Sequence, residues 1–266
     1  DALHIAPRAE GGWQLSVAIA DPTAYVEEGH AADLEARTRA FTVYLPGQNV
    51  TMLPEQLADD LCSLWEDKER PALACTLDIN ADGSLGEYRF FAANVKSHAK
   101  LVYDNVSDWI EGQGDWAPAD DIAEQLTALR DLTEARTAWR NEHALVFKDR
   151  PDYVFDLDPA GNVLAVRTEE RRIANRMIEE SMIVANACCA DFLAQHIGHG
   201  IFNVHRAFEP EKAEAAQEFL AGQEIVVERE ALTELARYTE LKRALESRDD
   251  AWLDARLRRF QGFTMM

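Results

Sequence analysis

The chain divides into a strand-rich first third and a helix-rich remainder, with the change near residue 104. The first part carries a β-rich run at 13–20 and a hairpin pattern over 72–95 that reverses at Asn80-Ala81-Asp82-Gly83. In the second part apolar residues recur at helical spacing, most clearly over 121–144. Strands followed by helices, rather than strict alternation of the two, predict an α+β fold.

The same patterns predict further elements. These are helices over 31–41, 55–66 and 168–195, and a second hairpin formed by 153–157 and 163–167. The longest of these helices is expected to begin at Thr168, which supplies half of a capping box. Two or three helices finish the chain, and one face of them is marked by Leu232, Leu235, Leu241 and Leu245. Because the sequence contains no repeat and no convincing linker, we expect one compact domain.

The charge of the chain limits its partners. The sequence has 27 basic and 48 acidic residues, which gives a formal net charge of −21. This balance argues against a protein that wraps broadly around nucleic acid, since Lys and Arg neutralise phosphates. It still permits a local basic channel inside an acidic shell. No apolar run approaches the roughly 20 residues that span a bilayer, and no signal peptide opens the sequence, so no membrane partner is expected.

The cysteines indicate a reducing compartment. Cys62, Cys75, Cys188 and Cys189 all lie in apolar stretches, and two of them are adjacent, which does not fit a secreted disulfide framework. We therefore expect reduced, mostly buried thiols in a cytoplasmic protein.

Generic catalytic signatures are scarce. The sequence contains no GxSxG, Walker loop, GxGxxG, HExxH or CxxC. A zinc site could be imagined from Cys188, Cys189, His196, His199 and His205. Only one histidine pair has ligand-like spacing, so these residues are better interpreted as core and loop residues.

Two adjacent acids in the predicted helix 168–195 differ in their positions. Glu180 falls near the apolar stripe, whereas Glu179 lies on its flank. A carboxylate near a buried stripe needs a partner, and Arg171, Arg172 or a ligand hydroxyl could supply it. From the residues alone, an internal ion pair is the favoured interpretation.

Three aromatic residues, Tyr44, Tyr103 and Phe147, each end a strand-like run and precede polar or turn residues. Such side chains can stack on nucleobases, because every base offers a π-face. Phe147 is also followed by two cations, Lys148 and Arg150. Core packing remains the simpler interpretation for any one of the three.

Several stretches, taken together and in order, carry a more specific signal. They are VAIADPTAYVEEG at 17–29, RAFTVYLPG at 39–47, MLPEQLADDLCSL at 52–64, KLVYDNVSDW at 100–109, HALVFKDRPDY at 143–153, RRIANRMIEESMIVAN at 171–186 and GIFNVH at 200–205. From end to end the chain thereby resembles the catalytic (RNB) domain of the ribonuclease II family, and its bacterial exoribonucleases most closely. The resemblance implies a mixed, mainly antiparallel sheet surrounded by helices.

The resemblance also implies an activity and a set of site residues. Family enzymes degrade single-stranded RNA processively from the 3′ end, release nucleoside 5′-monophosphates and use Mg²⁺ held by a cluster of aspartates. Asp1 matches the last aspartate of that cluster, and is thus the implied catalytic and metal-binding residue. Tyr44 and Phe147 match aromatics that clamp the terminal bases. Tyr103 and Glu179 match positions that distinguish RNA from DNA, a task that requires contacts sensitive to the 2′-hydroxyl.

The sequence departs from the family pattern at both ends. It begins inside the acidic motif, so three of the four aspartates lie outside it, and it stops before the segment whose arginine acts on the scissile phosphate. The two cold-shock-like barrels and the S1 barrel that flank the family domain are also missing. We therefore expect residues 1–266 to be part of an RNB catalytic domain, inactive or nearly so by itself because one carboxylate cannot hold two Mg²⁺ ions.

The parent protein is then expected to be an active, cytoplasmic, monomeric ribonuclease. Its partner would be single-stranded RNA, and oligonucleotide-binding domains would flank the catalytic domain. The alternative is a degenerate relative with the same fold, kept as an RNA-binding or protein-interaction module without catalysis.

Overall fold

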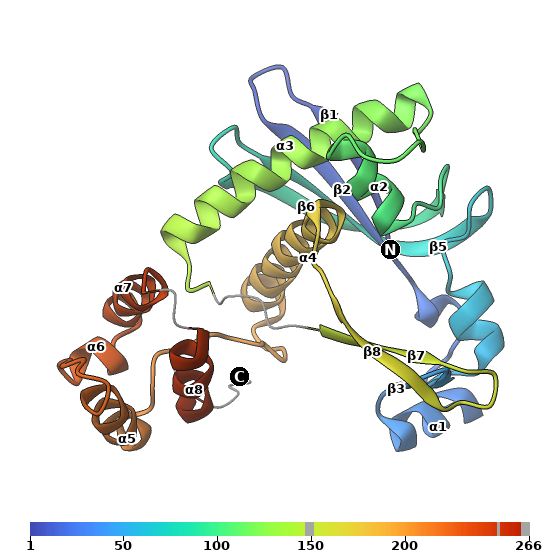
Figure 1. Cartoon of the computed structure of the whole chain (residues 1–266). Helices are drawn as coiled ribbons and strands as arrows, with labels where there is room; N and C mark the ends of the chain where they lie inside the picture. Colours follow the sequence, from blue (N-terminus) through green and yellow to red (C-terminus); the bar gives the residue numbers. More distant parts are fainter. Residues whose placement is uncertain (147–151, 249–250, 262–266) are drawn as a thin grey trace. The chain divides into compact units, whose positions relative to one another are not determined.

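In the computed structural model of the chain, which describes residues 1–146, 152–248 and 251–261, four antiparallel strands lie in the order β1-β2-β5-β6 (Figure 1). The strands are β1 (Ala2–Pro7), β2 (Trp13–Ala20), β5 (Glu69–Ile79) and β6 (Leu85–Lys96). Every neighbouring pair in this sheet is antiparallel. The predicted α+β class with a mainly antiparallel sheet is thus confirmed.

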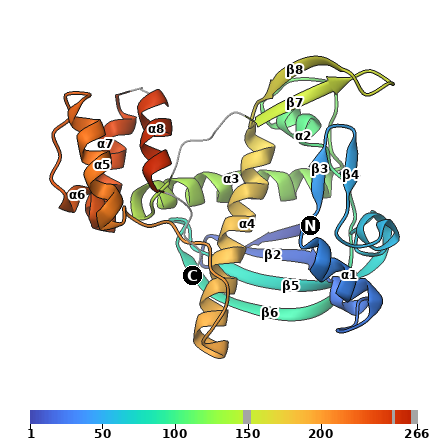
Figure 2. The same ribbon diagram turned by 90° about the horizontal axis from the view of Figure 1, so that it is seen from below.

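One face of the sheet forms the main apolar core. Leu15 and Val17 of β2 lie opposite Leu77 and Cys75 of β5, and all four side chains are buried. The helices α2 (Tyr103–Ile110), α3 (Asp120–His143) and α4 (Ile173–Phe192) pack against this face (Figure 2). Alternation of side chains along each strand sends the polar residues to the other face.

The turn between β5 and β6 is fixed against α3. The Gly83 backbone has a φ of +84°, which disfavours a residue with a side chain. A Cβ atom at this position would lie only 2.2 Å from the carbonyl oxygen of Ala135. Nη1 of the buried Arg136 donates a hydrogen bond of 2.6 Å to the Gly83 carbonyl. The sequence therefore predicted this turn correctly. The close approach of α3 explains why residue 83 is a glycine.

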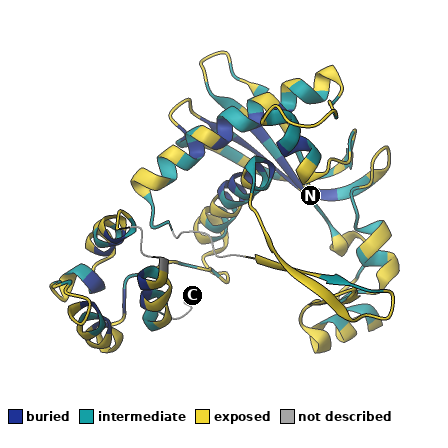
Figure 3. Cartoon of the chain, in the orientation of Figure 1, coloured by how far each residue is buried: buried dark blue, intermediate teal, exposed yellow. Residues whose placement is uncertain are grey.

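Two small hairpins lie beside each other in the same part of the molecule (Figures 1 and 2). The first, β3 (Val43–Leu45) with β4 (Gln48–Val50), follows helix α1 (Ala31–Arg39). The second pairs β7 (Asp152–Leu157) with β8 (Val163–Glu169), and β8 is exposed along its whole length (Figure 3). The hairpins touch where the side chain of Leu157 approaches the backbone of Gly47, with its Cδ1 atom 2.9 Å from where a Cβ would lie.

The start of α4 differs from the sequence prediction. Thr168 does not begin this helix, because it belongs to β8 and lies opposite Tyr153 of β7. The helix begins at Ile173, after the hairpin has ended. Capping signals are local, and here the pairing of two strands overrides them. After Phe192 the helical path continues in wider turns over Leu193–Ile197.

The last part of the chain is helical and has a core of its own. Its helices are α5 (Pro210–Ala221), α6 (Glu230–Thr233), α7 (Leu235–Glu246) and α8 (Ala251–Gln261). Leu232 and Leu245 are buried as predicted, but Leu235 is 48% exposed. The extended backbone of Glu234, with φ −96° and ψ 124°, separates α6 from α7 and breaks the expected common face.

Contacts divide the chain into two compact units, where the sequence predicted one domain. The first comprises Asp1–Trp139 and Phe147–Cys188, and the second Arg140–Val146 and Cys189–Met266. The physical reason is that the C-terminal helices bury their own side chains, such as Phe208, Leu220 and Leu257, separately from the core of the sheet. Within the described ranges, no helix is both long enough and apolar enough to cross a membrane.

Candidate functional site

Glu179 lies on the surface of α4 in a chain of charged contacts. Its Oε2 atom is 3.6 Å from Nη1 of Arg171, and both side chains remain more than one-third exposed. The same guanidinium donates from Nη2 to Oδ2 of Asp152 on β7 at 2.9 Å, and from Nε at 3.3 Å. The neighbouring Glu180 is only 5% exposed, as its place near the apolar stripe predicted.

Arg172 joins the start of α4 to α2. Its Nη2 atom donates to Oδ1 of Asp108 at 2.6 Å and to Oε2 of Glu111 at 2.7 Å. These hydrogen bonds, that to Glu111 first, raise the pKa of the Arg172 guanidinium, so it stays charged. The Ala174 amide also donates to the hydroxyl of Ser107 at 3.3 Å.

The two described aromatics of the predicted site are exposed rather than packed in the core. Tyr103 is the first residue of α2 and is 48% exposed. Tyr44 lies on β3 opposite Asn49 and is 78% exposed. Both rings are therefore open to a ligand, and the core-packing interpretation is wrong for them. Phe147 falls outside the described residues, as do Lys148 and Arg150.

The structure connects the elements that carry these residues. The β3–β4 turn contacts β7 through Leu157, and β7 is joined to Glu179 of α4 through Arg171. Helix α2, which begins with Tyr103, is joined to the start of α4 through Arg172. Over the described ranges, no hydrogen bond or ion pair joins the side chains of Tyr44, Tyr103 and Glu179 directly to one another. A ligand that touched all three would therefore have to span several elements.

The residues that the structure describes do not form a complete magnesium site. Asp1 is exposed at the start of β1, where the N label stands in Figure 1. In the part of the chain that the structure describes, no three His, Cys, Asp or Glu side chains come together in a way that could hold a metal ion. Mg²⁺ demands several oxygen ligands in octahedral geometry, and one carboxylate offers too few.

The cysteine and histidine residues considered for zinc do not come together either. Cys188 is fully buried, and the hydrogen bond that its thiol donates to Cys75, followed by burial, raises the pKa of the Cys188 thiol. A thiol kept protonated in a core is a poor metal ligand. Cys75 and Cys188 therefore pack the sheet against α4.

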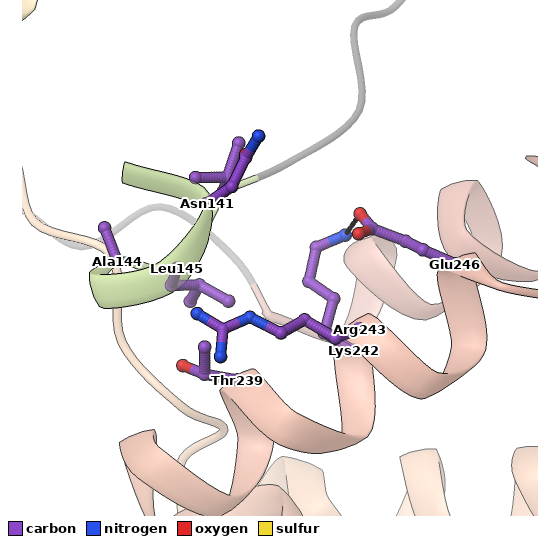
Figure 4. Close-up of a pocket in the computed structure, with 8 residues that line it drawn as sticks. Asn141, Ala144, Leu145, Thr239, Lys242, Arg243 and Glu246 are labelled. Carbon is purple, nitrogen blue, oxygen red and sulfur yellow. Dashed lines mark hydrogen bonds and ion pairs between the residues drawn. The ribbon is translucent and has the colours of Figure 1, made fainter. Parts of the chain in front are cut away.

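A pocket of about 220 Å³ lies in the second unit, between the end of α3 and α7 (Figure 4). Its walls include Asn141, Leu145, Thr239 and Arg243, and Nη2 of Arg243 donates to the carbonyl of Glu142 at 2.5 Å. This volume is below the range of about 300–1,000 Å³ that is typical of ligand sites. The pocket contains none of the residues that the sequence singled out.

Comparison with known proteins shows which family and which proteins this chain is similar to. The family described as RNB domain matches residues 1–262. An exoribonuclease 2 of Edwardsiella piscicida is 52% identical over 265 residues, which cover 99% of this chain and 41% of the relative. The chain therefore spans about two-fifths of the length of the curated relatives that it matches.

Solved structures share the fold. RNase R of Mycoplasma genitalium, solved with ribose-methylated single-stranded RNA, aligns with a TM-score of 0.88 at 23% identity, over 100% of this chain and 42% of that one. Yeast Ssd1, described as a pseudonuclease, aligns with a TM-score of 0.61 at 18% identity, over 84% and 27%. At these identities the likeness concerns the fold alone.

Proposed function

Because this chain belongs to the RNB domain family, we propose that it is part of a hydrolytic exoribonuclease. The proposed enzyme degrades single-stranded RNA processively from the 3′ end and releases nucleoside 5′-monophosphates. The observation that carries the proposal is 52% identity to an exoribonuclease 2 across 99% of the chain. The chain's share of that relative's length supports the further proposal that residues 1–266 are a piece of the catalytic domain.

The exposed side chains of the first unit suit contact with RNA. The Tyr44 ring, 78% exposed, is available for stacking on a base near the 3′ end, and Phe147 is proposed as the second aromatic of this clamp. The Glu179 carboxylate can accept a hydrogen bond from a ribose 2′-hydroxyl. DNA lacks that donor, so selectivity for RNA follows if Glu179 and Tyr103 face the sugar.

The metal of the whole protein is proposed to be Mg²⁺, with Asp1 as one of its ligands. The described residues do not complete such a site. We therefore assign no catalytic step to a metal within this chain, and we expect residues 1–266 alone to be inactive or nearly so.

The charge of the chain supports a role for further domains in binding RNA. At −21 the chain as a whole repels a polyphosphate, which favours a contribution from Lys and Arg of other domains to attracting the strand. We propose that oligonucleotide-binding domains flank this one in a cytoplasmic, monomeric protein.

A second candidate function is a non-catalytic RNA-binding or protein-interaction module. The observation in its favour is that the same fold occurs in yeast Ssd1, which is described as a pseudonuclease. Stacking by Tyr44 and recognition of the 2′-hydroxyl by Glu179 would serve such a module equally well.

A degradation assay separates the two functions. The protein at its natural full length is incubated with 5′-labelled single-stranded RNA, with Mg²⁺ or with EDTA, and the products are resolved by length. The enzyme hypothesis predicts mononucleotides and progressive shortening from the 3′ end only with Mg²⁺. RNA that is bound but never shortened would favour the module.

A further inference from the structure

Two consecutive arginines lie just before α4 and reach in different directions. Arg171 donates through Nε and Nη2 to Asp152 on β7. Arg172 donates to Asp108 and Glu111 on α2. Since both side chains are tied to other elements, the backbone that carries them is fixed on two sides.

The remaining edge of the Arg171 guanidinium faces Glu179. The planar guanidinium has a rigid set of donors, so the two bonds to Asp152 also fix the direction of Nη1. Nη1 lies 3.6 Å from Oε2 of Glu179, which is an ion-pair distance rather than a full hydrogen bond. The ion pair therefore favours one position of the Glu179 carboxylate. Its oxygen atoms can still accept a hydrogen bond from a ligand.

We propose that Arg171, anchored by Asp152, is a positioning residue that orients the Glu179 carboxylate for recognition of the ribose 2′-hydroxyl. The inference rests on the proposed function, because it concerns how the same site selects RNA. An exposed glutamate otherwise samples many rotamers, and a bound hydroxyl would have to order it. The ion pair orders the Glu179 side chain before the ligand binds. It therefore favours binding of a ligand that donates a hydrogen bond to the carboxylate.

A direct contact from Arg171 to an RNA phosphate is the main rival explanation. A bidentate phosphate would need two adjacent donors of the guanidinium. In the structure, Nε and Nη2 serve Asp152, and Nη1 faces Glu179, so a phosphate would have to displace a carboxylate. The geometry therefore favours orientation of Glu179.

The test compares affinities for RNA and DNA strands of the same sequence. Fluorescence anisotropy in EDTA gives both dissociation constants for the protein at its natural full length, without hydrolysis. The variants are Arg171→Gln, Arg171→Lys, Asp152→Asn and the matched control Arg167→Gln. Arg167 forms a similar exposed pair with Asp156 on the β7–β8 hairpin, at 2.6 and 2.7 Å, but is not bonded to Glu179.

The expected result is a change in selectivity. Arg171→Gln should lower the preference for RNA over DNA by about threefold or more, the range of coupling between contacting residues. Asp152→Asn should shift the preference in the same direction, Arg171→Lys should lie between wild type and Arg171→Gln, and Arg167→Gln should keep the wild-type ratio. In the Glu179→Gln background, Arg171→Gln should add nothing to the loss of preference.

Other results would overturn the inference. Equal weakening of RNA and DNA binding by Arg171→Gln, with an unchanged ratio, would indicate a phosphate contact. A wild-type protein without preference for RNA would also contradict it. Failure of the proposed function is distinguishable, because a protein that prefers RNA but does not hydrolyse it with Mg²⁺ loses only the enzymatic assignment.

Discussion

Glu179 and Glu180 are neighbours in the sequence but lie in opposite environments on α4. Glu179 pairs with Arg171 at the surface across 3.6 Å, whereas Glu180 is 5% exposed. Glu179→Gln is therefore expected to leave the free energy of unfolding within about 0.5 kcal/mol of wild type while it reduces selectivity for RNA. Glu180→Gln should instead destabilise the fold by about 1–3 kcal/mol, because it changes a polar group that is buried away from water. Urea unfolding of both variants measures these changes. A larger loss of stability for Glu179→Gln than for Glu180→Gln would contradict the prediction.

Tyr44 offers an aromatic face to solvent. Tyr44→Ala should weaken binding of single-stranded RNA by about 1–3 kcal/mol, the contribution of one base stacked on an aromatic ring. Stability should hardly change, because the side chain is 78% exposed. Tyr153→Ala is the matched control, since Tyr153 is an exposed tyrosine on the neighbouring hairpin, 61% accessible. Equal losses of RNA affinity in the two variants would mean that Tyr44 has no special role.

Gly83 and Gly161 allow the steric effect of a side chain to be separated from its conformational effect. Both have a φ of +84°, but a Cβ at Gly83 would lie 2.2 Å from the Ala135 carbonyl, whereas Gly161 has open space. Gly161→Ala is expected to cost about 1–2 kcal/mol, the penalty for a left-handed backbone. Gly83→Ala should cost about 2 kcal/mol more, because β5–β6 must move away from α3. Denaturant titrations measure the free energy of unfolding of both variants. Equal losses would show that the turn can move away from α3 without cost.

Asp254 holds two cations in the second unit. Its Oδ1 is 3.0 Å from Nζ of Lys242, which is 2% exposed and also pairs with Glu246, and its Oδ2 is 2.8 Å from Nη2 of Arg258. Asp254→Asn should destabilise this unit by about 1–3 kcal/mol, because the buried Lys242 ammonium keeps Glu246 but loses one of its two carboxylate partners. Hydrogen exchange of the α7 and α8 amides should accelerate, while that of β5 stays unchanged. Glu240→Gln, an exposed change on α7, is the control.

Local sequence signals predicted those elements whose residue pattern does not depend on contacts with distant parts of the chain. The β2 strand, the Asn80–Gly83 turn and the two strands of the 153–167 hairpin follow from alternation and turn residues, and α3 follows from its helical spacing. The prediction failed at Thr168, where a cap signal competes with pairing to Tyr153 across the β7–β8 hairpin. It also failed at Leu235, because the break at Glu234 depends on how α6 and α7 pack.

In the candidate site, too, the sequence predicted local features but not contacts between elements. The sequence separated Glu179 from Glu180 by their places relative to an apolar stripe, and the structure agrees about their burial. Alternation could not reveal that Tyr44 is exposed, since every residue of β3 and β4 is exposed and neither strand has a covered face to set the pattern. Asp152 was missed altogether, because its bond to Arg171 joins a strand to the irregular segment before a helix.

The most direct test of the account places residues 1–266 beside the protein at its natural full length in one assay. Both are incubated with 5′-labelled single-stranded RNA and Mg²⁺, and the release of nucleoside 5′-monophosphates is followed with time. We predict processive degradation by the full-length protein and little or none by residues 1–266. Absence of degradation by the full-length protein would contradict the proposed enzyme, and rapid degradation by residues 1–266 would contradict the account of an incomplete metal site.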